Sequence, residues 1–298
     1  MQKRKILVLI HKNDSAFVYF KYLIKLLMKH WEDWGFAVEV ARGIDHFVSA
    51  DVVIPHLDLT IIPAEYRDFL THYPIVINRD LVDISKSRIS ANILCRDDSH
   101  TGPVIIKTDF NSGGLPEQRL SSRMYLLRAL SSKLSGAISS QPKPGLPDFP
   151  AWAQVKYLKT SDYPVFPSLQ DVPGEIFDNK NLVVEKFLPE VQDGWYCVRY
   201  YHFLGDQEVS ELFRSKQEIV KGSDNGQFID APVPPELHAI RQRLGMDYGK
   251  IDYVLRDGRV VVLDVNRTPG IYGKGKLAQK VSNVLATGIL SKLNHTGA

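Results

Sequence analysis

Two β-rich runs near the end of the sequence constrain the fold of this chain more than any other feature. Residues 251–255 (IDYVL) and 259–265 (RVVVLDV) are joined by a short link that ends in Asp257 and Gly258. Asp-Gly between two such runs is a strong signal for a β-hairpin. The second run is apolar up to Asp264, which predicts a strand buried on both faces. A carboxylate there needs a compensating partner, because an unpaired buried charge is costly.

Three oxygen-bearing side chains are expected on one face of this hairpin. Asp264 and Asn266 are two residues apart and point to the same side of an extended chain, and Asp252 can pair across to that side. Carboxylate and amide oxygens are the ligands that a phosphate-bound Mg²⁺ takes from proteins. The alternative is that Asp264 ends a strand and Asn266 begins a turn before Pro269 and Gly270. The hairpin alone leaves both interpretations open.

A lysine followed by a glycine-containing loop occurs at residues 103–114 (PVIIKTDFNSGG). The first part predicts a buried strand that ends in Lys107, and residues 115–134 show a helical pattern. An ammonium at a strand end beside the flexible Gly113 and Gly114 suits phosphate binding. A Gly-Gly turn beside a solvated lysine is the alternative. The chain has no GxxxxGK[ST] loop, and no GxGxxG motif opens a helix after the first strand.

Residues 181–190 (NLVVEKFLPE) predict another apolar strand, which leads into a turn. The backbone of residues 185–188 could meet an adenine edge while Phe187 or Leu188 packs on the ring. A core strand followed by an ordinary turn explains the same pattern. The segment is therefore a candidate for nucleotide binding only in combination with its neighbours.

An arginine, Arg199, lies inside the aromatic run 195–206 (WYCVRYYHFLGD) and needs an anionic partner if it is buried. The chain thus contains, in order, a lysine strand with a glycine loop, an acidic strand, an arginine strand and the hairpin with two aspartates and an asparagine. This order resembles the ATP-grasp superfamily, particularly carboxylate–amine ligases of the glutathione synthetase, ribosomal-protein glutamate ligase and D-alanine–D-alanine ligase groups. The resemblance covers roughly residues 78–270. It implies an α/β (α+β) chain with an ATP-grasp fold, preceded by a small α/β domain around a parallel sheet.

The resemblance implies a role for each segment. The phosphates of ATP would be bound by Lys86, Lys107, Gly113 and Gly114, and adenine and ribose by Glu185, Lys186, Phe187, Leu188 and Glu190. Catalysis at the transferred phosphate would involve Arg199 and Arg214, together with Lys107. The metal ion, Mg²⁺ or alternatively Mn²⁺, would be bound by Asp252, Asp264 and Asn266. Asn78 matches an asparagine that ends a strand in the family.

Two positions depart from the family pattern. The middle metal position is more often glutamate, and Asp264 is one methylene shorter, which changes the expected coordination geometry. Lys86 and Lys107 are 21 residues apart, closer than the family pattern leads us to expect. Lys156 or Lys159 is therefore an alternative for the second phosphate-binding lysine.

Composition excludes several functional classes. The 298 residues carry 37 basic and 34 acidic side chains, a balance too even for a nucleic-acid-binding surface. Cys95 and Cys197 are isolated and share no metal-ligand spacing, which is typical of reduced cysteines in a cytoplasmic protein. The apolar run after the basic N-terminus is too short for a membrane span. We therefore expect a cytoplasmic enzyme without nucleic-acid or membrane partners, for which a homodimer is one option.

Periodicity divides the chain into three expected parts, namely a pre-ATP-grasp domain at 1–85 and ATP-grasp subdomains at 86–188 and 189–298. In the first part, a strand, a helix over 16–35 ending at Gly35, two strands, a helix and a strand predict a parallel sheet. The polar stretch 215–236 predicts a loop over an active site or a solvated connection.

Further polar residues are expected near an acceptor substrate. His11, Asp14 and His56 follow predicted strands, where open α/β sheets bind ligands, although polar loop residues are common there as well. Arg267 and Thr268 follow the hairpin and could hold a carboxylate or an acyl phosphate, or simply form a tight loop.

The activity that the resemblance implies is the ATP-dependent joining of a carboxylate to an amine through an acyl phosphate. Positioning and electrostatics would carry the catalysis, without a protein nucleophile. Small-molecule carboxylates and amines are the implied substrates. The alternatives are a small-molecule kinase of the same fold and a non-catalytic nucleotide-binding protein.

Overall fold

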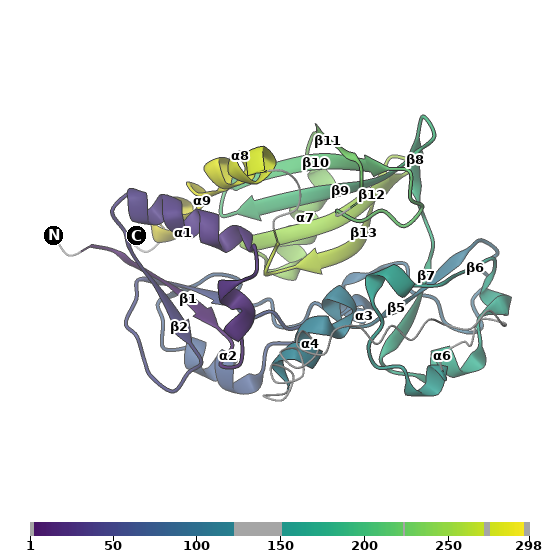
Figure 1. Cartoon of the computed structure of the whole chain (residues 1–298), viewed down its shortest axis with the longest axis horizontal. Helices are drawn as coiled ribbons and strands as arrows, with labels where there is room; N and C mark the ends of the chain where they lie inside the picture. Colours follow the sequence, from purple (N-terminus) through teal and green to yellow (C-terminus); the bar gives the residue numbers. More distant parts are fainter. Residues whose placement is uncertain (1–2, 122–150, 223, 271–274, 295–298) are drawn as a thin grey trace, which may run out of the picture. The chain divides into compact units, whose positions relative to one another are not determined.

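The computed structural model describes residues 3–121, 151–222, 224–270 and 275–294 (Figure 1). The chain forms two compact units. Unit 1 contains Met1–Ile84, Arg88–Ala91 and Leu188–Ala298, and unit 2 contains Ser85–Ser87 and Asn92–Phe187. The N-terminal sheet and the large C-terminal sheet thus belong to one unit, while the three-part division at residues 85 and 188 stays a prediction.

The N-terminal part of unit 1 contains the predicted parallel sheet. Its strands are β1 (Lys5–Ile10), β2 (Ala37–Arg42), β3 (Val52–His56) and β4 (Ile75–Val76), in the order β2-β1-β3-β4, and its helices are α1 (Leu23–Asp33) and α2 (Ala64–Leu70). Both faces of β1 are buried: Val8 packs in one apolar cluster and Leu9 in another. The mixed α/β class and the N-terminal parallel sheet are as predicted.

The first helix is shorter than the sequence predicts. Ser15–Val18 forms a 3₁₀ turn and α1 begins only at Leu23, after an extended Tyr22. The expected helix over 16–35 is therefore wrong in its first part. Tyr19 is solvent-exposed and so does not extend the buried stripe of α1. The end is as predicted, because Gly35 adopts a φ of 89° just after the helix.

Unit 2 is built around a small antiparallel sheet. The strands β5 (Val104–Thr108), β6 (Val165–Phe166) and β7 (Leu182–Lys186) are ordered β6-β5-β7. The helical elements are α4 (Leu115–Leu120), α6 (Gly174–Asp178) and 3₁₀ turns at Asn111–Gly114, Trp152–Gln154, Thr160–Asp162 and Leu169–Asp171, and the residues of α3 (Lys86–Ile89) are divided between the two units. The helix expected over 115–134 is confirmed as far as Leu120; its remainder lies largely outside the described residues.

A large antiparallel sheet forms the C-terminal part of unit 1. Its strands are β8 (Glu190–Gln192), β9 (Trp195–Leu204), β10 (Gln207–Ser215), β11 (Gln227–Asp230), β12 (Tyr248–Arg256) and β13 (Arg259–Asn266), in the order β11-β10-β9-β12-β13 with β8 beside β9. The helices are α7 (Pro235–Leu244), α8 (Gly275–Leu285) and α9 (Gly288–Asn294). Among the described helices, none is long and apolar enough to cross a membrane.

The two faces of this sheet are covered differently. On one face, Tyr201 and Ile251 pack with Leu237 of α7. On the other, Leu204 packs with Val281 of α8 in the cluster that also contains β1 and α1 (Figure 1). The large sheet and the N-terminal sheet therefore share a hydrophobic core within unit 1.

The stretch 215–236 is not wholly a loop. It contains β11, in which Phe228 pairs with Phe213 of β10, their ring centroids being 4.5 Å apart. The polar composition of this stretch gave no signal for a strand in the sequence. The strand is stabilised by one aromatic cross-strand pair.

The predicted hairpin is confirmed as β12–β13. Asp257 and Gly258 at its turn have φ values of 51° and 75°, as a two-residue turn of this kind requires. The expectation that the second strand is buried on both faces is wrong, because β13 lies at the edge of the sheet and Asp264 is only half-buried.

Candidate functional site

Asp252 and Asp264 are direct cross-strand partners in the hairpin, and Asn266 pairs with Lys250 one step further along. Directly paired residues point to the same side of a sheet, and so do residues two apart. All four side chains therefore share one face, as predicted for the two aspartates and the asparagine. This brings two carboxylates and an amide oxygen together in unit 1.

Lys250 is a member of this group that the sequence reasoning missed. Its Nζ lies 2.9 Å from Oδ1 of Asp252 and 4.6 Å from the ring centroid of Tyr200 on β9. The signal was present, because Lys250 is two residues before Asp252 in a strand and so must share its face. The face thus combines acidic side chains with one ammonium group.

The side chain of Asn266 also makes the local turn that was the alternative interpretation. Its Oδ1 accepts hydrogen bonds from the backbone N–H of Thr268 at 2.8 Å and from the Thr268 hydroxyl at 3.2 Å. An amide oxygen has two lone pairs, so this turn and metal coordination compete only in part. The turn fixes the orientation of the amide.

The residues of this face fit a magnesium ion that is held partly by phosphate. Across the described part of the chain, no group of three or more His, Cys, Asp or Glu side chains could hold a metal ion. A Mg²⁺ bound through one or two carboxylates, with substrate phosphates and waters as its other ligands, needs no such group. The pair of Asp252 and Asp264 meets this lower requirement.

Arg199 lies on the other face of the sheet, since it pairs with Tyr253, whereas its neighbour Tyr200 pairs with Asp252. Its guanidinium binds Glu190 through Nε and Nη2, at 2.8 to 3.2 Å, and both side chains are buried. Burial acts to lower the pKa of Arg199, but the hydrogen bonds and charge of Glu190 outweigh it and raise the pKa. The structure thus provides the anionic partner that the sequence required, and does not bring Arg199 to the aspartates.

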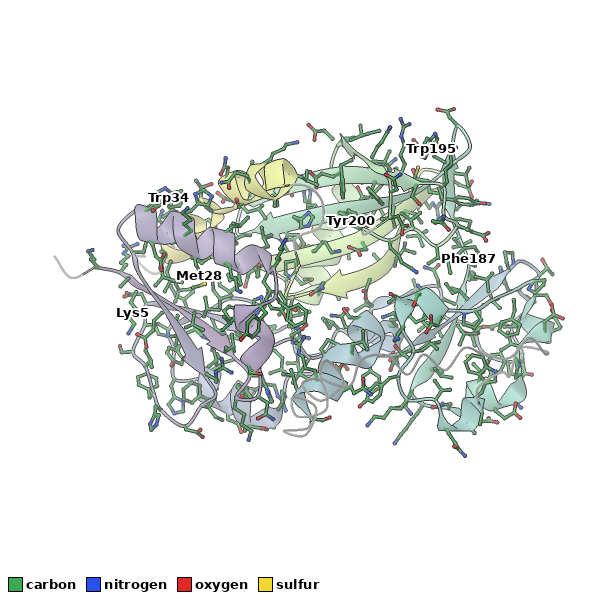
Figure 2. The ribbon with its side chains drawn as sticks, viewed as in Figure 1. Lys5, Met28, Trp34, Phe187, Trp195 and Tyr200 are labelled. Carbon is green, nitrogen blue, oxygen red and sulfur yellow. The ribbon has the colours of Figure 1, made fainter. Side chains whose placement is uncertain are left out.

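Glu190 and Arg214 are also engaged within the large sheet. Oε2 of Glu190 accepts the backbone N–H of Leu255 at 2.8 Å, which links β8 to β12. Arg214 donates to Oε1 of Gln227 at 2.8 and 3.1 Å and lies over the ring of Trp195, which is labelled in Figure 2. These contacts stabilise the sheet.

Unit 2 contains the predicted lysine at a strand end, Lys107, and the acidic residue Glu185. Nζ of Lys107 on β5 lies 2.5 Å from Oε2 of Glu185 on the adjacent strand β7, and both side chains are buried. Oε1 of Glu185 has no hydrogen-bond donor among the described residues. One oxygen of a buried carboxylate thus remains available to a ligand that donates a hydrogen bond, such as an amino or hydroxyl group.

The glycine loop is shaped by internal packing. Gly113 and Gly114 have φ values of 70° and 76°, and an added Cβ would lie 2.2 Å from the carbonyl oxygen of Leu158 and 2.4 Å from the ring of Tyr157. These close approaches explain both glycines. The alternative interpretation, a Gly-Gly turn, therefore accounts for the residue type without a ligand.

The other predicted lysines lie in different surroundings. Nζ of the buried Lys86 donates to the carbonyl oxygen of Phe110 at 2.9 Å, just before the glycine loop. Lys156 and Lys159 are exposed, in the segment that packs on Gly113. Lys86 thus holds the loop, whereas the two alternatives are accessible.

The predicted adenine-binding segment already uses part of its backbone. The N–H groups of Lys186 and Phe187 each donate at 2.9 Å, to the carbonyl oxygens of Asn92 and Pro103. Phe187 and Leu188 are half-buried, and Lys186 is exposed. An adenine edge would therefore have to bind other backbone atoms of this segment.

At the carboxyl end of β3, the N-terminal sheet is joined to the loop after the hairpin. Asp58 accepts hydrogen bonds from the hydroxyls of Thr268 and Tyr22, both at 2.9 Å. Arg267, which is buried, donates to the carbonyl oxygens of Thr60 and Val82 at 3.0 and 3.2 Å. The residues after the hairpin thus anchor it to the N-terminal sheet.

The three polar residues predicted near an acceptor are all buried in that region. Burial lowers the pKa of His11, which stacks on Tyr66, and lowers that of His56 to about 4. His56 lies edge-on to Tyr22 at 4.6 Å, and Asp14 is also buried. Burial therefore favours the uncharged form of both histidines.

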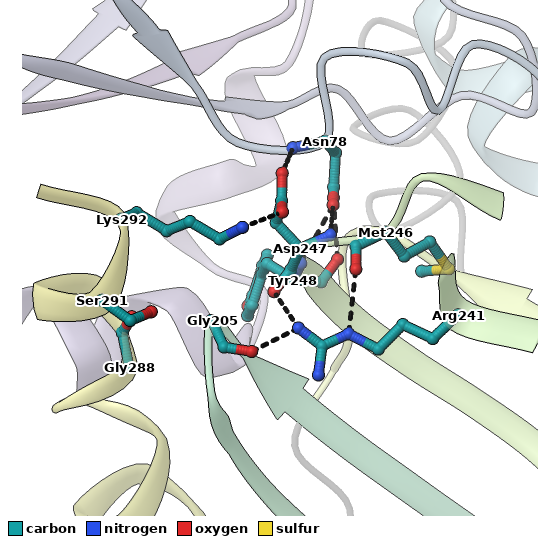
Figure 3. Close-up of polar contacts among 9 residues, drawn as sticks. All are labelled: Asn78, Gly205, Arg241, Met246, Asp247, Tyr248, Gly288, Ser291 and Lys292. Carbon is teal, nitrogen blue, oxygen red and sulfur yellow. Dashed lines mark hydrogen bonds and ion pairs between the residues drawn. The ribbon is translucent and has the colours of Figure 1, made fainter. Parts of the chain in front are cut away.

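Asn78 has a structural role that the sequence did not define. It adopts a φ of 58°, its Oδ1 accepts the backbone N–H groups of Asp247 and Tyr248 at 2.7 and 2.9 Å, and its Nδ2 donates to the Tyr248 carbonyl oxygen at 2.7 Å (Figure 3). Its own N–H donates to Oδ2 of Asp247, and Oδ1 of Asp247 accepts a hydrogen bond from Nζ of Lys292. Asn78 thereby fixes the start of β12.

Comparison with known proteins gives matches only among solved structures. No protein-family model matches the sequence, and no curated protein matches it. The chain is similar to a RimK domain protein ATP-grasp from Sphaerobacter thermophilus, with a TM-score of 0.47, 11% identity and coverage of 96% of this chain and 99% of that chain. It is also similar to the macrocyclase MdnB from Microcystis aeruginosa, with a TM-score of 0.43, 13% identity and coverage of 95% and 98%.

A third similar structure is D-alanine–D-alanine ligase from Bacillus anthracis complexed with ATP, with a TM-score of 0.46, 12% identity and coverage of 100% of both chains. Of these similar structures, the one from Sphaerobacter thermophilus is named as an ATP-grasp protein. Similarities of this size say nothing about activity, so the function is argued below from the residues of this chain.

Proposed function

We propose that this chain is an ATP-dependent ligase that activates a substrate carboxylate as an acyl phosphate and joins it to an amine. The observation that carries the proposal is the pairing of Asp252 with Asp264 on one sheet face, beside Lys250 and Asn266. A face with two carboxylates, one amide oxygen and one ammonium suits ATP with a bound metal ion. Its oxygens can bind the positive metal, and its ammonium can bind the negative phosphates.

In the proposed reaction, a carboxylate oxygen of the substrate attacks the γ-phosphorus of ATP, and the bond to the β,γ-bridging oxygen breaks to release ADP. The amine nitrogen then attacks the acyl carbon, phosphate leaves with the C–O bond electrons, and the amine loses a proton. When bound, Mg²⁺ would neutralise charge on the phosphates. No step needs a protein nucleophile.

The residues of this chain would act through position and charge. Asp252, Asp264 and Asn266 would hold the metal, and Lys250 would bind a phosphate oxygen in exchange for part of its contact with Asp252. Lys107 would bind phosphate as well, and Oε1 of Glu185 would accept a hydrogen bond from the nucleotide. The proposed metal is Mg²⁺, which Mn²⁺ can replace because it also favours carboxylate and carbonyl oxygens.

The remaining candidates receive supporting roles in this proposal. Arg199 with Glu190 would position β9 and β12, and Lys86 would position the glycine loop, since each is bound to protein groups. The backbone near Phe187 and Leu188 would contact adenine. Arg214 would contact ligand only if it leaves Gln227.

The test is ATP turnover with Mg²⁺ and a pooled panel of carboxylic acids, with hydroxylamine as the amine and mass spectrometry of the products. A hydroxamate formed together with ADP and phosphate supports the ligase. A stable phosphoester without hydroxamate would identify a kinase instead. Saturable ATP binding without any product across the panel would favour a non-catalytic nucleotide-binding protein.

A further inference from the structure

A second polar group occurs on the metal-binding face of the large sheet, one strand beyond the aspartates. Tyr200 of β9, which is labelled in Figure 2, pairs with Asp252 on one side and with Glu211 of β10 on the other, so the three side chains share a face. Two strand spacings separate the backbones of Asp252 and Glu211, about 10 Å. Nothing in the proposed ATP chemistry uses Glu211.

Glu211 lines a pocket within unit 1 that is partly open to solvent; its empty space, including the open part, is about 350 Å³. The sheet contributes Tyr200, His202, Glu211 and Phe228; Leu23 and Gly270 lie at its side; and Leu277, Ala278 and Val281 of α8 cover it. Apart from Glu211 and His202, the lining is mainly apolar and aromatic.

Two polar atoms in this pocket lack hydrogen-bond partners among the described residues. They are Oε1 of Glu211, whose residue is 1% exposed, and Nδ1 of His202, whose residue is 9% exposed. A buried polar atom without a partner is costly, and a carboxylate oxygen more so. A ligand with a hydrogen-bond donor would therefore be favoured in this pocket, and a positively charged donor would be favoured most.

Two described lysines near this face are already paired. Lys280 of α8 forms an ion pair with Asp230, and Lys250 forms one with Asp252. In each pair the positive charge of the lysine is balanced by an aspartate. The carboxylate of Glu211 therefore has no ion-pair partner among the described residues. Burial accordingly raises the pKa of Glu211 to about 7, with Lys280 and Asp230 acting in opposite directions.

His202 remains neutral, because burial and then Lys250 lower its pKa to about 3. A neutral imidazole can accept a hydrogen bond at one nitrogen. The acceptor nitrogen of His202, the carboxylate oxygen of Glu211 and the ring of Tyr200 could together bind an ammonium group. Such a group has three hydrogen-bond donors and is attracted by an aromatic ring. A metal cation would find too few oxygen ligands here, and an anion would be repelled by Glu211.

We propose that this pocket binds the protonated amino group of an aliphatic primary amine, with the carbon chain against the apolar lining. That this amine is the acceptor of the ligase rests on the function proposed above; the binding itself does not. The shared face places the amine one strand beyond Asp252, so the ligand can extend over Tyr200 toward the aspartates.

The test is titration of n-butylammonium chloride into the protein without nucleotide, followed by calorimetry or saturation-transfer NMR. The wild type should show saturable binding, and n-butanol, which has the same length and no charge, should show none. Glu211→Gln should weaken butylammonium binding at least about 10-fold, the effect of losing a hydrogen bond to a charged group. Glu208→Gln is the matched control, because Glu208 is on the same strand but on the other face, bound to Tyr201 and His238.

Ala278→Leu provides a second variant that leaves all charges in place and fills the pocket from α8. It should also abolish butylammonium binding. Equal binding to the wild type and both variants, or no saturable binding to the wild type, would overturn the proposal, and the pocket would then hold solvent only. ATP titrations of the same proteins test the ligase separately: loss of ATP binding with retained amine binding removes the ligase and keeps the pocket.

Discussion

Asp252 and Asp264 face each other across β12 and β13, immediately before a bulge that shifts the register at Tyr253. Two carboxylates in direct cross-strand contact repel each other, so such a pair is unfavourable unless a cation lies beside it. Lys250 supplies one positive charge to Asp252. A divalent cation that binds both carboxylates would relieve this repulsion, which is the basis for the metal proposed here.

Asp264→Asn should lower the apparent Mg²⁺ affinity of ATP turnover at least about 10-fold, because it removes one carboxylate from the pair while keeping its shape. The measurement is turnover at fixed ATP over a Mg²⁺ series. Asp257→Asn is the matched control, since Asp257 is an exposed turn residue of the same hairpin and Asn also tolerates its positive φ. An unchanged Mg²⁺ dependence in Asp264→Asn would exclude Asp264 as a ligand.

Lys107→Met should both destabilise the protein and weaken ATP binding. It leaves Glu185 buried and unpaired, which costs about 3–5 kcal/mol of unfolding free energy. Adding Glu185→Gln removes the charge, so the double variant should recover most of that stability while ATP binding stays weak. Urea unfolding and ATP titration of both proteins check this, with the exposed Lys180→Met as the control. Recovery of ATP binding along with stability would mean that Lys107 has only a structural role.

The hairpin could be predicted from the sequence because its signals are local. Asp257-Gly258 fixes the turn, and the period-two spacing of Asp264 and Asn266 fixes their shared face. The same spacing would have found Lys250. The face of Arg199 could not be derived in this way, because it depends on which residue of β12 pairs with β9. That register is set by long-range packing.

Other features could not be derived from the sequence, because neighbouring residues decide them. The sequence shows Gly113 and Gly114 as flexible, whereas the structure explains them by the close approach of Leu158 and Tyr157. The strand β11 has a polar sequence and forms through its pairing with β10. Glu211 has no motif around it and becomes a candidate only when the pocket under α8 is known.

Asn78→Ala should cost about 3 kcal/mol of unfolding free energy, because it removes the side chain that binds the backbone of Asp247 and Tyr248 and places a Cβ residue at positive φ. Asn78→Gly loses the same hydrogen bonds but tolerates the backbone, so it should be about 1 kcal/mol more stable than Asn78→Ala. Chemical denaturation measures both. Equal stability of the two variants would show that the backbone conformation at this position is relaxed.

The final prediction concerns the pH dependence of stability through His56. Its folded-state pKa is about 4, below the ordinary 6.5, because it is buried. Between these values the unfolded chain binds more protons than the folded chain, so the contribution of His56 to stability is complete above about pH 6.5 and declines as the pH falls toward 4. His202 contributes with the same sign and Glu211 with the opposite sign, since burial raises the pKa of Glu211.

The contribution of His56 can be isolated by difference. In His56→Gln, which cannot titrate, the free energy of unfolding should fall less between pH 7 and pH 5 than in the wild type. The measurement is urea unfolding at both pH values. The same substitution at the exposed His46 should leave the wild-type pH dependence intact. A wild-type pH dependence in His56→Gln would mean that His56 gains a proton without opening the fold, and that the region around Tyr22 and Asp58 accommodates its charge.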